Sequence, residues 1–149
     1  METKEIDRLI RDIHKHLVQY TKGKLKDIGL TMPRFLVLWH IRKFQSVNMS
    51  FLHEKMYMAN STLTVIVDKL VEEELVKRYR NPEDRRIVLL ELTANGEELL
   101  KEILDIRQDF LEKGLADIEI SEQKKIINLL KPVLGNLEEM LKEGDDVNE

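Results

Sequence analysis

The sequence predicts a mainly α-helical protein that contains one β-hairpin, and three observations support this. Over most of the chain, apolar residues recur every three or four positions, which is the period of an amphipathic helix. Between about residues 77 and 92 the pattern changes to two short strands around the turn Asn81-Pro82-Glu83-Asp84. The 149 residues, 42% of them hydrophobic, suffice for the core of one domain of ordinary size. We therefore expect residues 1–149 to form a single domain.

Two helices are expected in the first third of the chain. The spacing of apolar residues predicts a helix from about residue 4 to residue 27, and Gly29 is placed to end it, because glycine readily adopts the left-handed conformation of a helix terminus. Thr31 is placed to cap the second helix, with Pro33 in the first turn, where its missing N–H has little cost. The apolar row of this second helix ends near Phe44.

Two more helices joined by a tight turn should follow. Val47–Met49 can supply a brief strand for the hairpin to pair with, and Ser50 is placed to cap a short third helix. Tyr57–Ala59 would form the turn, although it contains no glycine. The fourth helix should begin with the small polar residues Asn60–Thr62, which can cap it, and have an apolar row of Leu63, Ile66, Val67 and Leu70. This arrangement is a helix-turn-helix.

The hairpin after this helix pair is basic. Residues 77–86 hold five Lys or Arg against two acidic residues. A helix-turn-helix followed by such a hairpin is a winged helix, in which the second helix of the pair fits a DNA major groove. Guanidinium groups at the hairpin tip can then reach the neighbouring minor groove or the phosphates. The sequence thus predicts a winged helix-turn-helix over about residues 31–93, with double-stranded DNA as its partner.

Two long helices are expected after the hairpin. Thr93 is placed to cap a helix that reaches about Asp117, and Ser121 to begin the last one. Pro132 lies inside the last helix and predicts a kink there, because proline removes one backbone hydrogen bond and clashes with the preceding turn. The residues from Glu143 onward should be frayed.

The last helix has a wide apolar stripe, wider than a small winged domain can cover. A second copy of the same helices is the simplest surface to cover it. We therefore expect a homodimer in which about residues 1–30 and 94–143 form the helical dimerisation part.

The net charge of −4 by itself argues against a nucleic-acid partner, because binding to phosphates depends on positively charged side chains. Its distribution matters more. Residues 1–93 hold 17 Lys or Arg against 13 Asp or Glu, whereas residues 94–149 hold 7 against 15. The acidic excess therefore lies beyond the hairpin.

The composition argues against several classes of protein. Without cysteine, disulfides, Cys-based zinc sites and thiol switches are excluded. The N-terminus lacks the apolar segment of a secretory signal, and no apolar run approaches the roughly 18 residues of a membrane helix, so we expect a cytoplasmic protein with no membrane partner.

Catalysis and metal binding are also not expected. The six glycines stand singly rather than in a phosphate-binding loop, and no nucleophile with its base is recognisable, so we expect no enzyme, no catalytic residue and no cofactor. His14 and His16 are two apart on a helix and point in different directions, so they cannot chelate one ion.

The hairpin and the helix before it also carry a family resemblance. Asp84-Arg85-Arg86, followed after five residues by Leu92-Thr93-Ala94-Asn95-Gly96, resembles the wing signature of MarR-family transcriptional regulators. The segment Leu63–Leu70 resembles their recognition helix, and in length and helix order the likeness covers nearly all of the chain. The resemblance implies a dimeric winged-helix repressor or activator, usually tuned by a small ligand.

Candidate DNA contacts lie on the fourth helix and on the hairpin. Polar side chains beside the buried row of the helix should face the major groove, and the helix N-terminus can face a phosphate. Asp84 and Arg86 are two apart on a hairpin, so the carboxylate can hold the guanidinium extended, for the minor groove as the resemblance also implies. The expected DNA contacts are Asn60, Ser61, Thr62, Thr64, Lys69, Arg78, Arg80, Asp84, Arg85 and Arg86.

A ligand site is less well defined by the sequence. The resemblance implies that aromatic or phenolic effectors bind in the crevice between the dimer helices and the winged domain. Tyr20, Met32, Phe35 and Trp39 could line that crevice, but they could equally be ordinary core residues.

Two functions stay open at this point. The first is a transcriptional regulator, most simply a repressor, that binds a pseudo-palindromic operator as a homodimer. The alternative is a ligand-sensing or protein-interaction scaffold of the same fold without specific DNA binding. Val65 keeps the alternative open, because many relatives carry Arg at this outward position.

Two further positions depart from the family pattern: His53 stands where Ala is common, and Glu74 where Gly usually ends the recognition helix. Backbone strain is therefore expected at Glu74.

Overall fold

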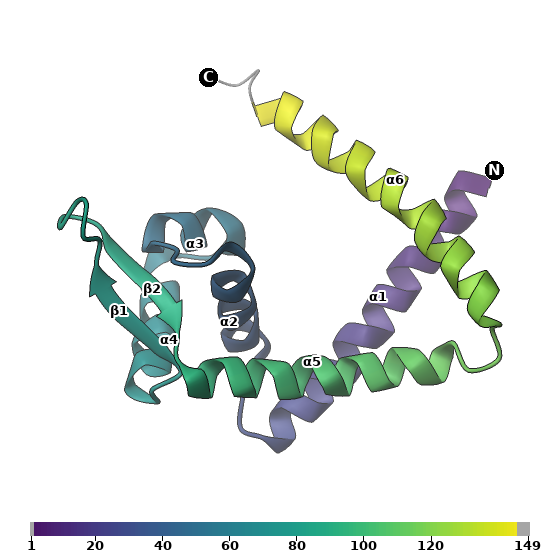
Figure 1. Ribbon diagram of the computed structural model, residues 1–149. Helices are drawn as coiled ribbons and strands as arrows, with labels where there is room; N and C mark the ends of the chain where they lie inside the picture. The colour runs from purple at the N-terminus through teal and green to yellow at the C-terminus, as the bar shows by residue number, and fades with distance from the viewer. Residues whose placement is uncertain (1, 146–149) are drawn as a thin grey trace. The chain divides into compact units, whose positions relative to one another are not determined.

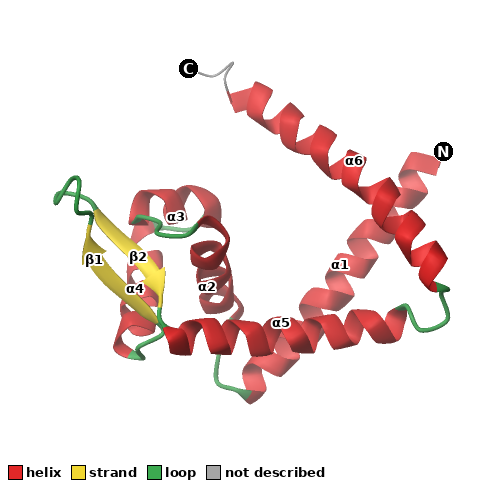
Figure 2. Cartoon of the chain, in the orientation of Figure 1, coloured by secondary structure: helices red, strands yellow, loops and turns green. Residues whose placement is uncertain are grey.

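The computed structural model describes residues 2–145 and is mainly helical, as predicted (Figures 1 and 2). A two-stranded antiparallel sheet lies between the fourth and fifth helices in the sequence. The elements are α1 (Glu2–Asp27), α2 (Met32–Phe44), α3 (Met49–Met56), α4 (Asn60–Glu72), β1 (Val76–Arg80), β2 (Val88–Leu92), α5 (Ala94–Gly114) and α6 (Ile120–Asp145).

The chain divides into two compact units, one up to Phe110 and one from Leu111 onward. The first unit holds α1 to β2 and most of α5; the second holds the last residues of α5 and all of α6. Inside the first unit, the ring of Tyr20 on α1 stacks on that of Phe110 on α5 with centroids 4.0 Å apart.

The hydrophobic core of the first unit joins the helix-turn-helix to the hairpin. Leu38 on α2, Leu63 on α4 and Leu90 on β2 are completely buried, and Leu52 on α3 completes this contact between four elements. Burying one such leucine contributes about 1.5–3 kcal/mol. Packing therefore fixes α4 and the hairpin relative to each other, which makes the two elements one rigid surface.

The ends of the first two helices agree with the sequence prediction. Gly29 has φ +69°, and Thr31 is the N-cap residue of α2, with extended backbone and Pro33 in the first turn, although its side chain makes no cap hydrogen bond. The cap of α3 was predicted wrongly. Asn48, not Ser50, caps this helix by accepting a hydrogen bond from the Phe51 N–H at 2.8 Å, so α3 begins two residues earlier than predicted.

Both ends of α4 depart from the usual sequence pattern. Ala59 is the N-cap residue, and its methyl group cannot accept a cap hydrogen bond. Because Asn60 is already helical, the prediction that Asn60–Thr62 would cap this helix is wrong. At the other end Glu74 adopts φ +58°, as its place at a glycine position led us to expect. Its N–H donates to the Val71 carbonyl, and the next N–H, of Leu75, donates to the Leu70 carbonyl, so the helix ends in a Schellman turn despite the missing glycine.

The wing is a short hairpin that pairs Val76 with Leu92 at its base and Arg80 with Val88 near its tip (Figure 1). As predicted, the segment after α2 adds a third, minimal strand: Val47 forms one antiparallel bridge with Leu90. At the base of the wing Gly96 is required, because a Cβ there would lie 2.1 Å from the Leu75 carbonyl oxygen.

The bounds of the last two helices differ from prediction by a few residues. Thr93 caps α5, as predicted, by accepting a hydrogen bond from the Gly96 N–H at 3.1 Å; α5 ends at Gly114 rather than Asp117. The final helix begins at Ile120, one residue before Ser121, and holds Pro132 in its interior. It continues to Asp145, so the fraying expected from Glu143 is not seen up to that residue; residues 146–149 lie outside the described residues.

Candidate nucleic-acid interface

The outward face of α4 carries the residues predicted to meet the major groove. Leu63, Val67 and Leu70 are completely buried, which fixes the opposite side of the helix toward solvent. The exposed side chains of this face include Asn60, Ser61, Thr62, Thr64, Val65 and Lys69. Free backbone N–H groups at the start of a helix attract anions, so this end of α4 can also face a phosphate.

The tip of the wing holds Arg86 in an extended position. Its Nε and Nη2 donate to the two carboxylate oxygens of Asp84, both at 3.1 Å, and its backbone N–H donates to the same carboxylate. The guanidinium side chain is nevertheless 90% exposed. The hydrogen bonds from the Arg86 side chain, and then from its backbone, lower the pKa of Asp84, so this carboxylate is charged at neutral pH. The predicted pairing of these two residues is therefore present.

The turn around this pair is itself ordered by hydrogen bonds. The Asn81 side chain accepts from the Glu83 N–H at 2.9 Å, and the Ile87 N–H donates to the Asp84 carbonyl at 3.0 Å. Arg80 Nη1 donates to the Arg85 carbonyl at 2.7 Å, across the hairpin. The wing tip is therefore a shaped loop with Arg85 and Arg86 on its outside.

Arg78 was predicted as a phosphate contact, but the structure places its guanidinium against Asp68 on α4. This ion pair joins the strand β1 to the middle of the recognition helix. Sequence reasoning missed Asp68 as a partner, although both residues are polar positions on neighbouring elements of a helix–strand unit. The guanidinium of Arg78 is thus already partly neutralised, unlike that of Arg85, for which no ion pair is found within residues 2–145.

A second ion pair, also missed from the sequence, holds the far end of α4. Arg34 in the first turn of α2 pairs with Glu73, which directly follows α4. Only 12% of the Arg34 side chain is exposed, and burial lowers its pKa. Because α4 is tied to α2 at one end and to the wing in its middle, its orientation is set by charges as well as by the core.

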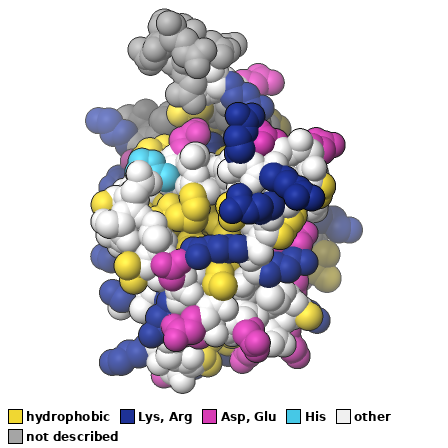
Figure 3. All heavy atoms as spheres, turned by 90° about the vertical axis from the view of Figure 1, so that its left-hand side faces the viewer, with side chains coloured by type: hydrophobic (Ala, Val, Ile, Leu, Met, Phe, Trp, Pro, Cys, Tyr) yellow, Lys and Arg dark blue, Asp and Glu magenta, His cyan; other side chains and the backbone are white. Residues whose placement is uncertain are grey.

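Figure 3 shows the hairpin side of the first unit with all atoms as spheres. Several Lys and Arg side chains lie close together near the middle of this face, and Asp and Glu side chains occur at its lower edge. The hairpin on this side of the unit carries the Lys and Arg residues of positions 77–86, which are expected to meet DNA.

Three of the four residues predicted to line a ligand crevice do line one hollow, of about 350 Å³. Met32, Phe35 and Trp39 come from α2, Leu104 and Arg107 from α5, and His14 and Val18 from α1. A second hollow, of about 620 Å³, adjoins it through Val18 and Met32 and has Lys22 and Lys26 in its wall. Tyr20 lines neither hollow, because its ring is stacked on Phe110.

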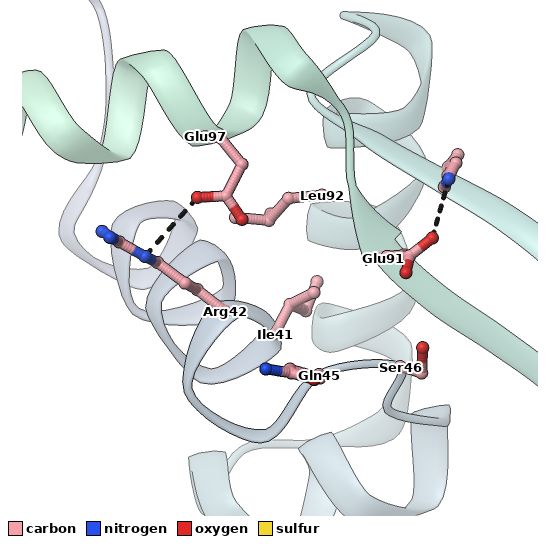
Figure 4. A pocket seen from close by; sticks show the side chains of 8 residues that line it. Ile41, Arg42, Gln45, Ser46, Glu91, Leu92 and Glu97 are labelled. Carbon is pink, nitrogen blue, oxygen red and sulfur yellow. Dashed lines mark ion pairs between the residues drawn. The ribbon is translucent and has the colours of Figure 1, made fainter.

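A further cleft, of about 520 Å³, lies between the end of α2, the sheet and the start of α5 (Figure 4). Arg42 points across it toward Glu97 at 3.5 Å, and Lys77 pairs with Glu91 at 2.7 Å. Since its cations and acids neutralise one another, we assign no ligand to this cleft.

The winged region of the chain matches the model of a known protein family. The MarR family model matches residues 30–88, which run from the end of the α1–α2 loop to the first residue of β2. The HTH-type transcriptional regulator YsmB of Bacillus subtilis, itself described as uncharacterized, is 30% identical over 130 residues, which are 85% of this chain and 89% of that protein. The chain belongs to the MarR family.

Other relatives and solved structures are similar to most of the chain. The transcriptional regulator SarZ of Staphylococcus haemolyticus is 32% identical, and the alignment covers 82% of each chain. Among solved structures, a MarR family protein from Bacillus stearothermophilus superposes with a TM-score of 0.81 at 26% identity, covering 91% of this chain and 95% of its own. The transcriptional regulator Tm0710 of Thermotoga maritima gives 0.77 at 27% identity, with coverages of 93% and 98%.

Membership in the MarR family makes the protein a DNA-binding transcriptional regulator rather than an enzyme, as the sequence predicted. In the part of the chain that the structure describes, no helix is long and apolar enough to cross a membrane. Likewise, no cluster of three or more His, Asp or Glu side chains within residues 2–145 could hold a metal ion.

Proposed function

We propose that the protein is a homodimeric repressor that binds a pseudo-palindromic operator, with α4 in the major groove and the wing tip in the minor groove. The observation that carries this proposal is the Asp84–Arg86 pair, which holds an almost fully exposed guanidinium at the end of the hairpin. A surface ion pair stabilises a fold by only about 0–1 kcal/mol, so stability gives little reason for this arrangement. A guanidinium held in place is well suited to a narrow groove of negative potential.

The contact residues follow from this placement. On α4 they are Asn60, Ser61, Thr62, Thr64 and Lys69, and on the wing Arg85 and Arg86, with Asp84 as the positioning residue. Arg80 supports the tip through the Arg85 carbonyl and adds positive charge, and Arg78 contributes less because Asp68 neutralises it in part.

The dimer is proposed from two exposed apolar rows, each on its own helix. Ile6, Leu9, Ile10 and Ile13 form the row on α1, and Leu130, Val133, Leu134 and Leu137 belong to the row on α6. A second copy of the chain would cover both, in an interface of more than about 2,000 Å². Residues 1–30 and 94–143 would then be the dimerisation part. Two recognition helices in such a dimer would meet half-sites about 10 base pairs apart.

A small ligand is proposed to modulate DNA binding from the hollow between α1, α2 and α5. Met32, Phe35 and Trp39 give it apolar walls, and Arg107 gives it a cation for an acidic or phenolic group. The hollow lies beside the first turn of α2, whose Arg34 holds the end of the recognition helix, so an occupant that moves this turn would also move α4.

The test is a gel shift on the DNA upstream of the protein's own gene, with and without competitor DNA, at several salt concentrations. Arg86→Ala should weaken binding and lower the salt slope by about 1 for each half-site that the arginine no longer reaches. Asp84→Ala should also weaken binding, although it removes a negative charge that DNA repels. Arg11→Ala on α1, which removes an exposed Arg–Asp pair of the same kind at 2.8 Å, is the matched control and should change neither quantity.

Tighter binding by Asp84→Ala would contradict the positioning role and leave the wing as a merely basic surface. Equal binding to specific and competitor DNA by the wild type would instead favour the scaffold function. On α4, Thr62→Glu should abolish specific binding while the fold stays intact, because it places a negative charge against the hydrogen-bond acceptors of the DNA. Unchanged operator affinity would show that other residues read the bases.

A further inference from the structure

The recognition helix exposes a large apolar side chain at the centre of its outward face. Val65 is 66% exposed, while the three completely buried residues of α4 lie on the opposite side. Folding gives no reason for a valine here, because its exposed side chain gains little from burial and valine is a weaker helix former than Lys, Arg, Glu or Gln. On a helix proposed to lie in the major groove, this exposed side chain is placed to meet a base.

The surroundings of Val65 indicate which kind of base it meets. From Asn60 to Val67 the helix has no charged residue, so no Arg or Lys is available there for the paired acceptors of guanine. The Thr64 hydroxyl donates to the Asn60 carbonyl at 2.8 Å, so its proton is already used within the helix. One turn further, Asp68 is paired with Arg78.

In the major groove the only methyl group of an unmodified base is the C5-methyl of thymine, and apolar side chains recognise it by contact. We propose that Val65 packs on a thymine methyl in each half-site and makes the operator depend on a T·A pair at that position. This inference rests on the proposed operator binding of the dimer, and it assigns the central position of α4 to methyl recognition. The absent base-reading cation is then a change of specificity, not a loss of DNA binding.

The experiment begins with a selection from a pool of randomised duplex DNA by the wild-type protein, which yields an operator whichever genes the protein regulates. Each thymine of the selected duplex is then replaced by deoxyuridine, which removes only the methyl group. One thymine in each half-site should be sensitive. Burial of one methyl-sized group is worth about fourfold in affinity, so replacing both thymines should weaken binding by about fifteenfold.

The variant Val65→Ala should bind the thymine operator more weakly than the wild type and should no longer distinguish thymine from deoxyuridine at that position. Val88→Ala removes the same atoms from an exposed valine of the wing and is the matched control. It should keep the full sensitivity to deoxyuridine. The variant Val65→Arg, put through the same selection, should enrich guanine where the wild type enriches thymine.

The outcomes separate this inference from the function on which it rests. If the wild type enriches no sequence from the pool, operator binding itself is overturned. If it enriches a palindrome in which no thymine is sensitive to deoxyuridine, or if Val65→Ala keeps the sensitivity of the wild type, only the role of Val65 is overturned.

Discussion

Apolar side chains are buried in the winged region but exposed along the terminal helix α6. In the winged region, leucines from α2, α3, α4 and β2 cover one another completely. Along α6, no residue from Ile120 to Lys142 is buried, although Leu130 and Leu137 continue an apolar row as regular as any in the core. The DNA-binding surface therefore rests on a core that its own unit supplies, whereas the second unit by itself leaves the apolar row of α6 uncovered. Four experiments test this difference between the two regions and its consequences for stability.

The largest effect is expected on α6. Replacing Leu130 and Leu137 together by Glu should abolish the dimer, because charges without partners would be buried in the proposed interface. Asn128→Glu introduces the same side chain on the opposite side of the helix and is the control. Sedimentation at micromolar concentration should show dimer for the wild type and the control only. A double variant that remains a dimer would show that the apolar row of α6 is covered in another way.

The next effect concerns the self-covered core. Leu38→Ala should lower the free energy of unfolding by about 2–5 kcal/mol, since its completely buried side chain would leave a cavity. Leu36→Ala on the same helix removes a side chain that is partly exposed and should cost clearly less. Urea unfolding of both variants measures the difference. Equal losses of unfolding free energy in the two variants would show that burial within the chain is not what stabilises this region.

A smaller effect, of opposite sign, is expected at the end of α4. Glu74 has φ +58°, a conformation that costs a residue with a side chain roughly 1–2 kcal/mol and a glycine much less. Glu74→Gly should therefore raise the stability by about 1 kcal/mol. Glu72→Gly, inside the last turn of the helix, should lower it by a similar amount. Thermal unfolding distinguishes the two, and destabilisation by both would contradict the strain at Glu74.

The smallest effect concerns the dependence of stability on pH. Burial, and then the charges of Lys43 and Lys55, lower the pKa of His40 in the folded protein. The unfolded chain then binds more protons than the folded one, so His40 favours folding above its ordinary pKa and this contribution is lost as the pH falls through about 6.5 toward the lowered value. His40→Asn should reduce the fall in melting temperature between pH 7.5 and pH 5.5. An unchanged difference between the two pH values would exclude His40 as its source.

The sequence by itself determined the features that depend on local pattern. The helices, the hairpin and the glycine at position 29 follow from apolar spacing and turn residues, which act over a few neighbouring positions. The Asp84–Arg86 pair was predictable for the same reason, because two residues that are two apart in a hairpin share one side. The exposure of Val65 also follows from the helical period, since the buried row fixes the opposite side.

Only the tertiary structure decided which side chains meet across elements. Arg78 could face DNA or another protein residue, and the packing of β1 beside α4 brings it to Asp68. The pairing of Arg34 with Glu73 joins positions 39 apart in the sequence, and the stacking of Tyr20 on Phe110 joins positions farther apart still. Asn48 and Ser50 were equally suitable caps by residue type, and the backbone of the loop selected Asn48. Such contacts depend on how whole elements pack, because a helical period fixes the direction of a side chain relative to its own helix but not the element that it reaches.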